Sequence, residues 1–202
     1  MRRRAVAGYT MLEIMISVVV MTIGATGILA MQGASVRSNQ DASETTVAIN
    51  FATTWMERIK RDARSWNNIG TADLTGTNTQ YLKLAATANG VWSVPAATLP
   101  ESAGADYFGF DTPVGANPDL VRYCVNVRFT QAHTFGGSVD SLRADVLVWW
   151  HRSSSQDTTR ANATCATPLT AAQIASVGAD DRKLRKHFLS TVVTWKDPST
   201  WP

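Results

Sequence analysis

Glu13 has an unusual setting, because it is the single acid in the apolar run AGYTMLEIMISVVVMTIGATGILAM at residues 7–31 of this 202-residue chain. A carboxylate at the centre of a bilayer costs roughly 2.5–3.5 kcal/mol on insertion scales. An acid in apolar surroundings is tolerated when a positive group pairs with it. We therefore interpret Glu13 as a candidate pairing site and not as a catalytic residue.

The residue types that usually carry catalysis are scattered along the rest of the chain. His133, His151 and His187 form no two-histidine helical metal pair, and the chain has neither a nucleophile-elbow motif nor a phosphate-binding glycine loop. The acids of Asp106–Asp111 and of GADDRK lack the spacing of a calcium loop, although a local calcium site in the later part of the chain stays an alternative. We expect no enzyme activity, no cofactor and no metal.

Two cysteines, Cys124 and Cys165, make an even count that is compatible with one disulfide in an oxidising compartment. Their spacing matches no zinc site, and two thiols alone cannot complete one. We predict the disulfide Cys124–Cys165, which would stabilise the fold by about 4 kcal/mol in the chain-entropy model. Two buried free thiols are the alternative.

The net charge of +3 comes from the first residues of the chain, where Arg2, Arg3 and Arg4 stand together. Without residues 1–8 the chain has as many Lys and Arg as Asp and Glu, so its formal charge is zero. A global electrostatic case for nucleic-acid binding therefore fails, although the local basic stretch RKLRKH at residues 182–187 remains.

Residues 14–31 contain no charge and are about long enough to cross a bilayer as a helix. The preceding arginines would keep the N-terminus cytoplasmic and place the bulk of the chain outside. A cleavable secretory signal fits poorly because the run is long and lacks the usual break before cleavage. A simple anchor leaves Glu13 unexplained, and a soluble core helix would not be apolar on opposite faces.

The stretch RRRAVAG followed by YTMLE resembles the type III leader of type IV prepilins. That family has a short basic leader ending in glycine, an aromatic residue just after the cut, and a glutamate five residues after it. Here these are Gly8, Tyr9 (where phenylalanine is usual) and Glu13. The resemblance implies cleavage after Gly8 by a prepilin peptidase, N-methylation of Tyr9, and neutralisation by Glu13 of the N-terminal amine of a neighbouring subunit. Snorkelling of Glu13 to the membrane interface is the alternative.

A helix is predicted from about Tyr9 to Ser65, some 85 Å at 1.5 Å per residue. Gly24 and Gly27 each weaken it by about 1 kcal/mol, inviting a kink or local melting, or else permitting close helix packing. The second half repeats apolar residues every three or four positions, which predicts packing on a core. This apolar stripe consists of Ala48, Phe51, Ala52, Trp55, Met56, Ile59, Ala63 and Trp66.

Three later segments alternate with period two and are predicted strands: residues 121–129, 142–150 and 188–195. Gly136–Gly137 suits a hairpin loop between the first two. We expect residues 66–119 to be a long connection, TAAQIAS after Pro168 to be a short helix, and the tryptophans at 92, 149, 195 and 201 to finish the core or form a surface patch. The expected fold is α+β, the type IV pilin fold, with a long N-terminal helix on an antiparallel sheet of three to four strands.

The expected division is a cleaved leader (1–8), a membrane and filament-core half-helix (9–31), an amphipathic half-helix (32–66) and a globular head (67–202). The N-terminal third, with VLVWWHR and FLSTVV, looks like PilV-type minor pilins. That resemblance implies a subunit that primes a type IV pilus and supports twitching motility or adhesion. It would lie in the inner membrane before assembly and then near the pilus tip. Its partners would be the assembly platform, other minor pilins, the major pilin and, in a tip complex, an adhesin. The alternatives are a type II secretion minor pseudopilin of the I type and a solitary membrane-anchored binding domain.

Overall fold

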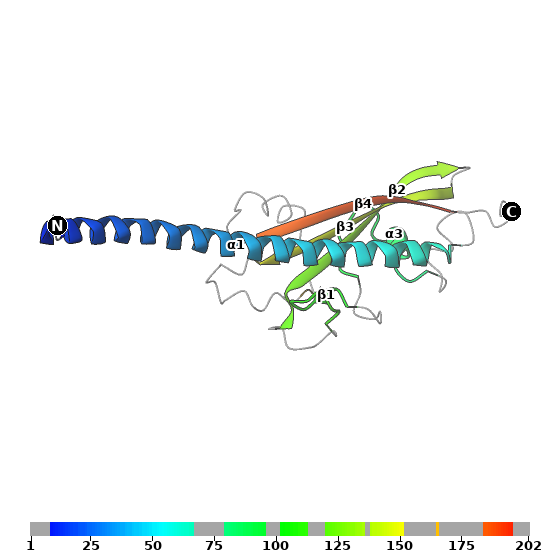
Figure 1. Cartoon of the computed structure of the whole chain (residues 1–202). Coiled ribbons are helices and arrows are strands. Elements are labelled where there is room, and N and C mark those ends of the chain that lie inside the picture. The colour runs from blue at the N-terminus through cyan, green and yellow to red at the C-terminus, as the bar shows by residue number, and fades with distance from the viewer. Residues whose placement is uncertain are drawn as a thin grey trace, which may run out of the picture. The chain divides into compact units, whose positions relative to one another are not determined.

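The computed structural model describes residues 9–66, 79–95, 102–112, 120–135, 138–151, 165 and 184–195, which Figure 1 draws in colour. Within these residues lie the helices α1 (Met11–Ala63) and α3 (Leu84–Thr87) and the strands β1 (Gly104–Ala105), β2 (Tyr123–Phe135), β3 (Ser138–His151) and β4 (Leu184–Thr194). The strands pair in the order β1-β2-β3-β4, and every pair is antiparallel. The predicted α+β architecture, a long N-terminal helix packed on an antiparallel sheet, is confirmed.

The chain divides between Ala42 and Ser43 into two compact units, which we call the N-terminal unit and the head. Helix α1 supplies residues to both. The helix begins and ends two residues inside the predicted bounds, because the backbone leaves α-helical pairing at Arg64–Trp66, where it closes i to i+3 hydrogen bonds. It is long and apolar enough, near its N-terminus, to cross a membrane.

The head half of α1 packs on the sheet through the predicted apolar stripe. Its members from Ala48 to Ile59 are buried, as is Trp66, and Ala63 packs against the same cluster. The sheet face against them is built from alternate residues of β2 and β3 together with Val193 of β4. Those residues are Tyr123, Val125, Val127 and Phe129 from β2, and Leu142, Ala144, Val146, Val148 and Trp150 from β3.

The strands are longer than predicted. Strands β2 and β3 pair as far as Phe135 and Ser138, so most of the expected connection TQAHTFGGSVDS is strand. The period-two pattern is lost there because the β2–β3 register shifts around His133. The predicted turn residues 136–137 lie outside the described residues. Strand β4 begins at Leu184 and therefore includes most of the basic stretch RKLRKH.

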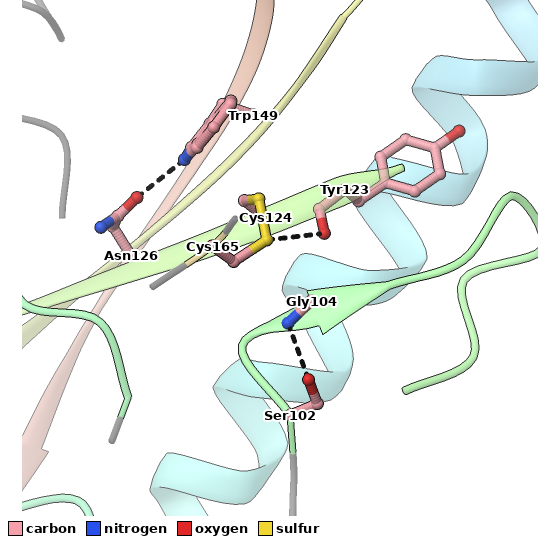
Figure 2. The surroundings of a disulfide bond; sticks show 7 residues. All are labelled: Ser102, Gly104, Tyr123, Cys124, Asn126, Trp149 and Cys165. Carbon is pink, nitrogen blue, oxygen red and sulfur yellow. Dashed lines mark hydrogen bonds between the residues drawn. A yellow bond between two sulfur atoms is a disulfide. The ribbon is translucent and has the colours of Figure 1, made fainter. Parts of the chain in front are cut away.

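The sheet is buried on both faces at its centre. Asn126 is only 1% exposed and Trp149 only 7%, and the Trp149 indole donates to the Asn126 side-chain oxygen at 2.8 Å (Figure 2). Trp92 and Trp195 are half-buried. Trp149 is thus buried and Trp195 packs against the core cluster, whereas Trp92 contacts Phe188 and Arg128. Trp201 lies outside the described residues.

The predicted connection over residues 66–119 contains elements that its sequence did not reveal. Helix α3 lies in it, Ser93 forms a bridge with Val127 of β2, and β1 pairs with the start of β2. The Asp62 carboxylate, near the end of α1, accepts the backbone N–H groups of residues 80, 81 and 82 at 2.6–2.8 Å and ties this segment to the helix. Burial raises the pKa of Asp62, although these backbone hydrogen bonds oppose the rise. The predicted helix TAAQIAS lies outside the described residues.

Candidate assembly site

Glu13 lies in the first turn of α1, where it is exposed. Its backbone N–H donates to the hydroxyl oxygen of Thr10 at 3.3 Å, so Thr10 caps the helix. Tyr9 is the first residue described and is 82% exposed, and Gly8 lies outside the described residues. The predicted pairing residue therefore stands one turn from the predicted mature N-terminus with an open carboxylate.

The Thr10–Glu13 spacing is the S/T-x-x-E signature of a helix start, and sequence reasoning overlooked it. A helix N-terminus carries a partial positive charge that stabilises a nearby carboxylate by roughly 0.3–1 kcal/mol. Thus the position of Glu13 in the helix offsets a small part of the cost of placing an acid in apolar surroundings. The cost that remains favours pairing of the Glu13 carboxylate with a cation.

The N-terminal unit presents apolar side chains on every side of α1. More than half of each of these side chains is exposed: Met11, Leu12, Ile14, Met15, Ile16, Val18, Val19, Val20, Met21, Ile23, Ile28, Leu29 and Met31. The polar hydroxyls among them are satisfied within the helix, since Ser17, Thr22 and Thr26 donate to backbone carbonyl oxygens at 2.7–2.9 Å. Such a surface requires an apolar environment, either lipid or other helices.

Gly24 and Gly27 both lie inside α1, which is assigned as α-helix through both positions. A Cβ added at either glycine would meet no atom within 4 Å beyond the adjoining backbone of α1 itself. Within the described residues, the surface of α1 at Gly24 and Gly27 is therefore uncovered, and a second helix could pack closely there. The kink or melting predicted for these glycines, and their role in close packing, stay predictions.

Glu44 is a buried acid in the head that sequence reasoning missed. Its side chain is 2% exposed and accepts hydrogen bonds from Arg122 at 2.9 Å and from the Trp150 indole at 3.2 Å. The Tyr123 hydroxyl donates to the Glu44 carbonyl oxygen at 3.4 Å, and burial raises the pKa of Tyr123 to about 12. This cluster fixes the point at which α1 enters the head.

A second buried acid, Asp145, lies on the sheet face opposite α1. Its fully buried carboxylate accepts hydrogen bonds from Arg128, Arg143 and Ser190 at 2.7–3.0 Å. Burial alone would raise the pKa of Asp145, but the hydrogen bonds from Ser190, Arg128 and Arg143 together hold it below its ordinary value. The cluster joins β2, β3 and β4 and is structural, since every polar partner is already engaged within the fold.

Cys124 of β2 and Cys165 form a disulfide with 5.3 Å between their Cα atoms (Figure 2). Cys124 lies on the face away from α1, whereas Tyr123 points toward the helix (Figure 2). The Cys165 sulfur lies 3.3 Å from the position a Cβ would take on Gly104 of β1. The disulfide thus holds Cys165 over the β1–β2 pair, where residue 104 has no room for a side chain.

The described residues contain no group of three or more His, Cys, Asp or Glu side chains that could hold a metal ion. His133 pairs with Asp140 at 2.8 Å on the surface, while His151 and His187 lie on β3 and β4. The expectations of no metal, no cofactor and no enzyme activity stay predictions.

Comparison with known protein families finds a match at one end of the chain. Residues 3–29 match the family model of the prokaryotic N-terminal methylation motif, a span that includes Gly8, Tyr9 and Glu13. No curated protein and no solved structure matches the chain. The chain therefore carries a type IV prepilin-like leader in front of a type IV pilin-like α+β architecture, which supports a pilin-like or pseudopilin protein anchored in a membrane.

Proposed function

We propose that the chain is a minor pilin of a type IV pilus, which primes filament assembly and becomes part of a complex near the pilus tip. One observation carries the proposal: the methylation motif runs directly into a helix that is apolar on all sides and then continues into the head. A surface of this kind serves as a membrane anchor before assembly and as a filament core afterwards.

Glu13 would favour the transfer of the subunit from the membrane to the filament. In the lone subunit its carboxylate lies in a largely apolar segment without a cation among the neighbouring residues 9–31. Cleavage after Gly8 would create a new positive amine on every mature subunit. Pairing Glu13 with the amine of an adjacent subunit would relieve the cost of the buried acid. The chemistry is assembly, and we propose no catalytic role and no cofactor.

The pilus is favoured over a type II secretion pseudopilus by the length of the head. Residues 67–202 follow the helical segment, and I-type pseudopilins generally have shorter heads. The N-terminal third also resembles the PilV type. Other minor pilins, the major pilin and the inner-membrane assembly platform would be the partners, with an adhesin at the tip.

Deletion of the gene separates the candidate functions. Loss of surface pili and of twitching motility, restored by the wild-type gene, supports the pilus subunit. Loss of protein secretion with intact pili supports the pseudopilus instead. If both phenotypes are absent and the leader remains uncut, a solitary membrane-anchored domain replaces both.

A further inference from the structure

Strand β4 lies at the end of the sheet order, and β3 is its one partner among the described strands (Figure 1). The Trp195 N–H, just after β4, donates to the Asp140 carbonyl oxygen at 2.8 Å, and these two residues continue the β3–β4 register. Backbone groups alternate in direction along an antiparallel strand, so Ser190 and Val192 turn their N–H and C=O groups away from β3. We call this side of β4, at residues 188–194, the β4 edge.

The β4 edge lacks the features that normally keep an edge strand from pairing. It contains no proline and no charged residue, and the β3–β4 register has no bulge. No backbone hydrogen bond joins its outward groups to other described residues. Phe188 is 44% exposed and Val192 is 60% exposed on the same face of the strand. Because an unprotected edge is a template for a further strand, the β4 edge is suited to strand addition.

A partly exposed cation lies beside the β4 edge. The Arg143 side chain is 49% exposed, and its Nε donates to the Asp145 carboxylate at 2.9 Å and to the Ser190 hydroxyl at 3.1 Å. These bonds hold the guanidinium next to β4, whereas its two terminal nitrogens donate to none of the described residues. Asp145 also pairs with Arg128, so this cluster has two cations for one acid. A strand added here meets positive charge, which an acidic side chain complements.

We propose that the β4 edge binds an extended acidic segment of another protein as an additional antiparallel strand. The backbone of the segment pairs with Ser190 and Val192. A carboxylate opposite Ser190 accepts from the Arg143 terminal nitrogens, and apolar side chains on either side of it cover Phe188 and Val192. The proposal goes beyond the proposed function and does not depend on it.

The described residues favour another protein over a second copy of this chain. Strand β4 contains no acid, so two copies paired edge to edge would bring no carboxylate to Arg143. At the opposite side of the sheet, β1 and Ser93 already pair with β2. A lipid or a sugar is disfavoured as well, because neither has a backbone that continues the hydrogen-bond ladder.

Hydrogen exchange on the purified full chain in detergent micelles, with a peptide as the probe, tests the proposal. The probe is Thr-Val-Thr-Glu-Thr-Val-Thr, whose glutamate and two valines share one face of a strand. At saturation it should slow exchange at the Ser190 and Val192 amides by about tenfold or more. Exchange at Leu189 and Thr191 should stay unchanged, because these amides already donate to β3.

Two results of this experiment would overturn the proposal. The first is unchanged exchange at Ser190 and Val192 at peptide concentrations up to about 5 mM. The second is protection of Ser190 that rises with the concentration of the chain itself in the absence of peptide, because a second copy would then fill the β4 edge.

N-methylation of the peptide separates strand addition from other modes of binding without any change to the protein. In the added strand the glutamate N–H faces β4, whereas the N–H of the next threonine faces solvent. N-methylation at the glutamate should weaken binding by about tenfold or more, and N-methylation at that threonine by about twofold or less. Equal losses would contradict strand addition.

A double-mutant cycle tests the acidic specificity. The variant Arg143→Gln should weaken binding of the glutamate peptide about three- to fivefold and leave binding of the matching glutamine peptide unchanged. The control Arg61→Gln, at an exposed position near the end of α1, should leave binding of both peptides unchanged. Equal weakening of both peptides by Arg143→Gln would refute the proposed carboxylate contact, and with it the acidic partner.

Discussion

Replacing Glu44 tests how α1 is held on the head. The structure buries this carboxylate between the helix and the sheet, with the Arg122 guanidinium and the Trp150 indole as its donors. We consider Glu44→Ala, which removes both acceptors, and Glu44→Gln, which keeps the size of the side chain but removes its charge. Both should destabilise the head, and the alanine variant should do so more.

The magnitude follows from what each partner loses. Removing one member of a buried ion pair costs about 3–5 kcal/mol when the other member stays buried. The Arg122 side chain is 24% exposed and can regain water, so its share is smaller, whereas the Trp150 N–H would lose its acceptor in a side chain that is only 2% exposed. We therefore expect a loss of about 2–4 kcal/mol in the free energy of unfolding for Glu44→Ala and about 1–2 kcal/mol for Glu44→Gln.

Urea denaturation of the purified full chain in detergent micelles, followed by tryptophan fluorescence, measures these losses. The matched control is Glu57→Gln, because Glu57 is on the same helix, is 62% exposed and forms a surface pair with Lys60. That control should cost less than about 0.5 kcal/mol. If Glu44→Gln changed the unfolding free energy no more than Glu57→Gln does, the reasoning about the buried Glu44 cluster would be refuted.

Four further variants test other parts of the account. Asp145→Asn should lower the free energy of unfolding at pH 7 by about 2–4 kcal/mol, because it removes the charge that pairs two arginines. Since the pKa of Asp145 is lowered in the fold, its stabilisation is complete above the ordinary value of 3.8 and is lost as the pH falls through the lowered value. Denaturation at pH 7 and pH 3 should therefore show a smaller difference between wild type and variant at pH 3, and an unchanged difference would contradict this. Gly104→Ala should cost about 1–3 kcal/mol, because the added methyl would meet Val121 at 3.0 Å and the disulfide at 3.3 Å. Gly33→Ala, in open helix, should be neutral or stabilising by up to about 1 kcal/mol in the same assay, and a reversed order would be the contrary result. Glu13→Val should give a subunit that is processed but fails to enter filaments, as judged by its amount in sheared pili, whereas normal incorporation would show that Glu13 only snorkels to the interface.

The helical stripe and the paired strands could be predicted because their side chains follow the geometric period of the element that carries them. The stripe from Ala48 to Ile59 recurs every three or four residues and is buried as expected. The centres of β2 and β3 alternate with period two and lie where the pattern placed them. The leader motif could be found because Gly8, Tyr9 and Glu13 follow one another at fixed spacing.

The structure departs from the sequence prediction at residues whose burial depends on partners that are remote in sequence. Glu44 lies four residues before Ala48, on the line of the stripe, but a lone glutamate on a helix is normally exposed, and its partners Arg122 and Trp150 are remote in sequence. Asn126 and Asp145 alternate with the apolar residues of their strands, yet each is buried and accepts a hydrogen bond from a neighbouring strand. The pattern of polar residues along the sequence cannot by itself reveal such hydrogen bonds between strands.

Short and irregular elements also escaped prediction for a physical reason. Strand β1 has two residues, Gly104 and Ala105, too few to show any alternation. The turn at residues 107–110 beside it is shaped by hydrogen bonds to Asp106 and by the positive φ of Gly109, which act within a few residues and leave no periodic trace. In the candidate assembly site, Thr10 could have been found from its spacing to Glu13.

The central claim is that the chain is a processed, membrane-anchored subunit whose mature N-terminus is Tyr9. Mass spectrometry of the N-terminal peptide, from wild type and from a Gly8→Val variant made in the same cells, tests it most directly. We expect the wild-type peptide to begin at Tyr9 with an N-methyl group and the variant to retain its leader. The claim would be contradicted by a wild-type peptide that still begins with the leader, or by the same Tyr9 terminus in both proteins.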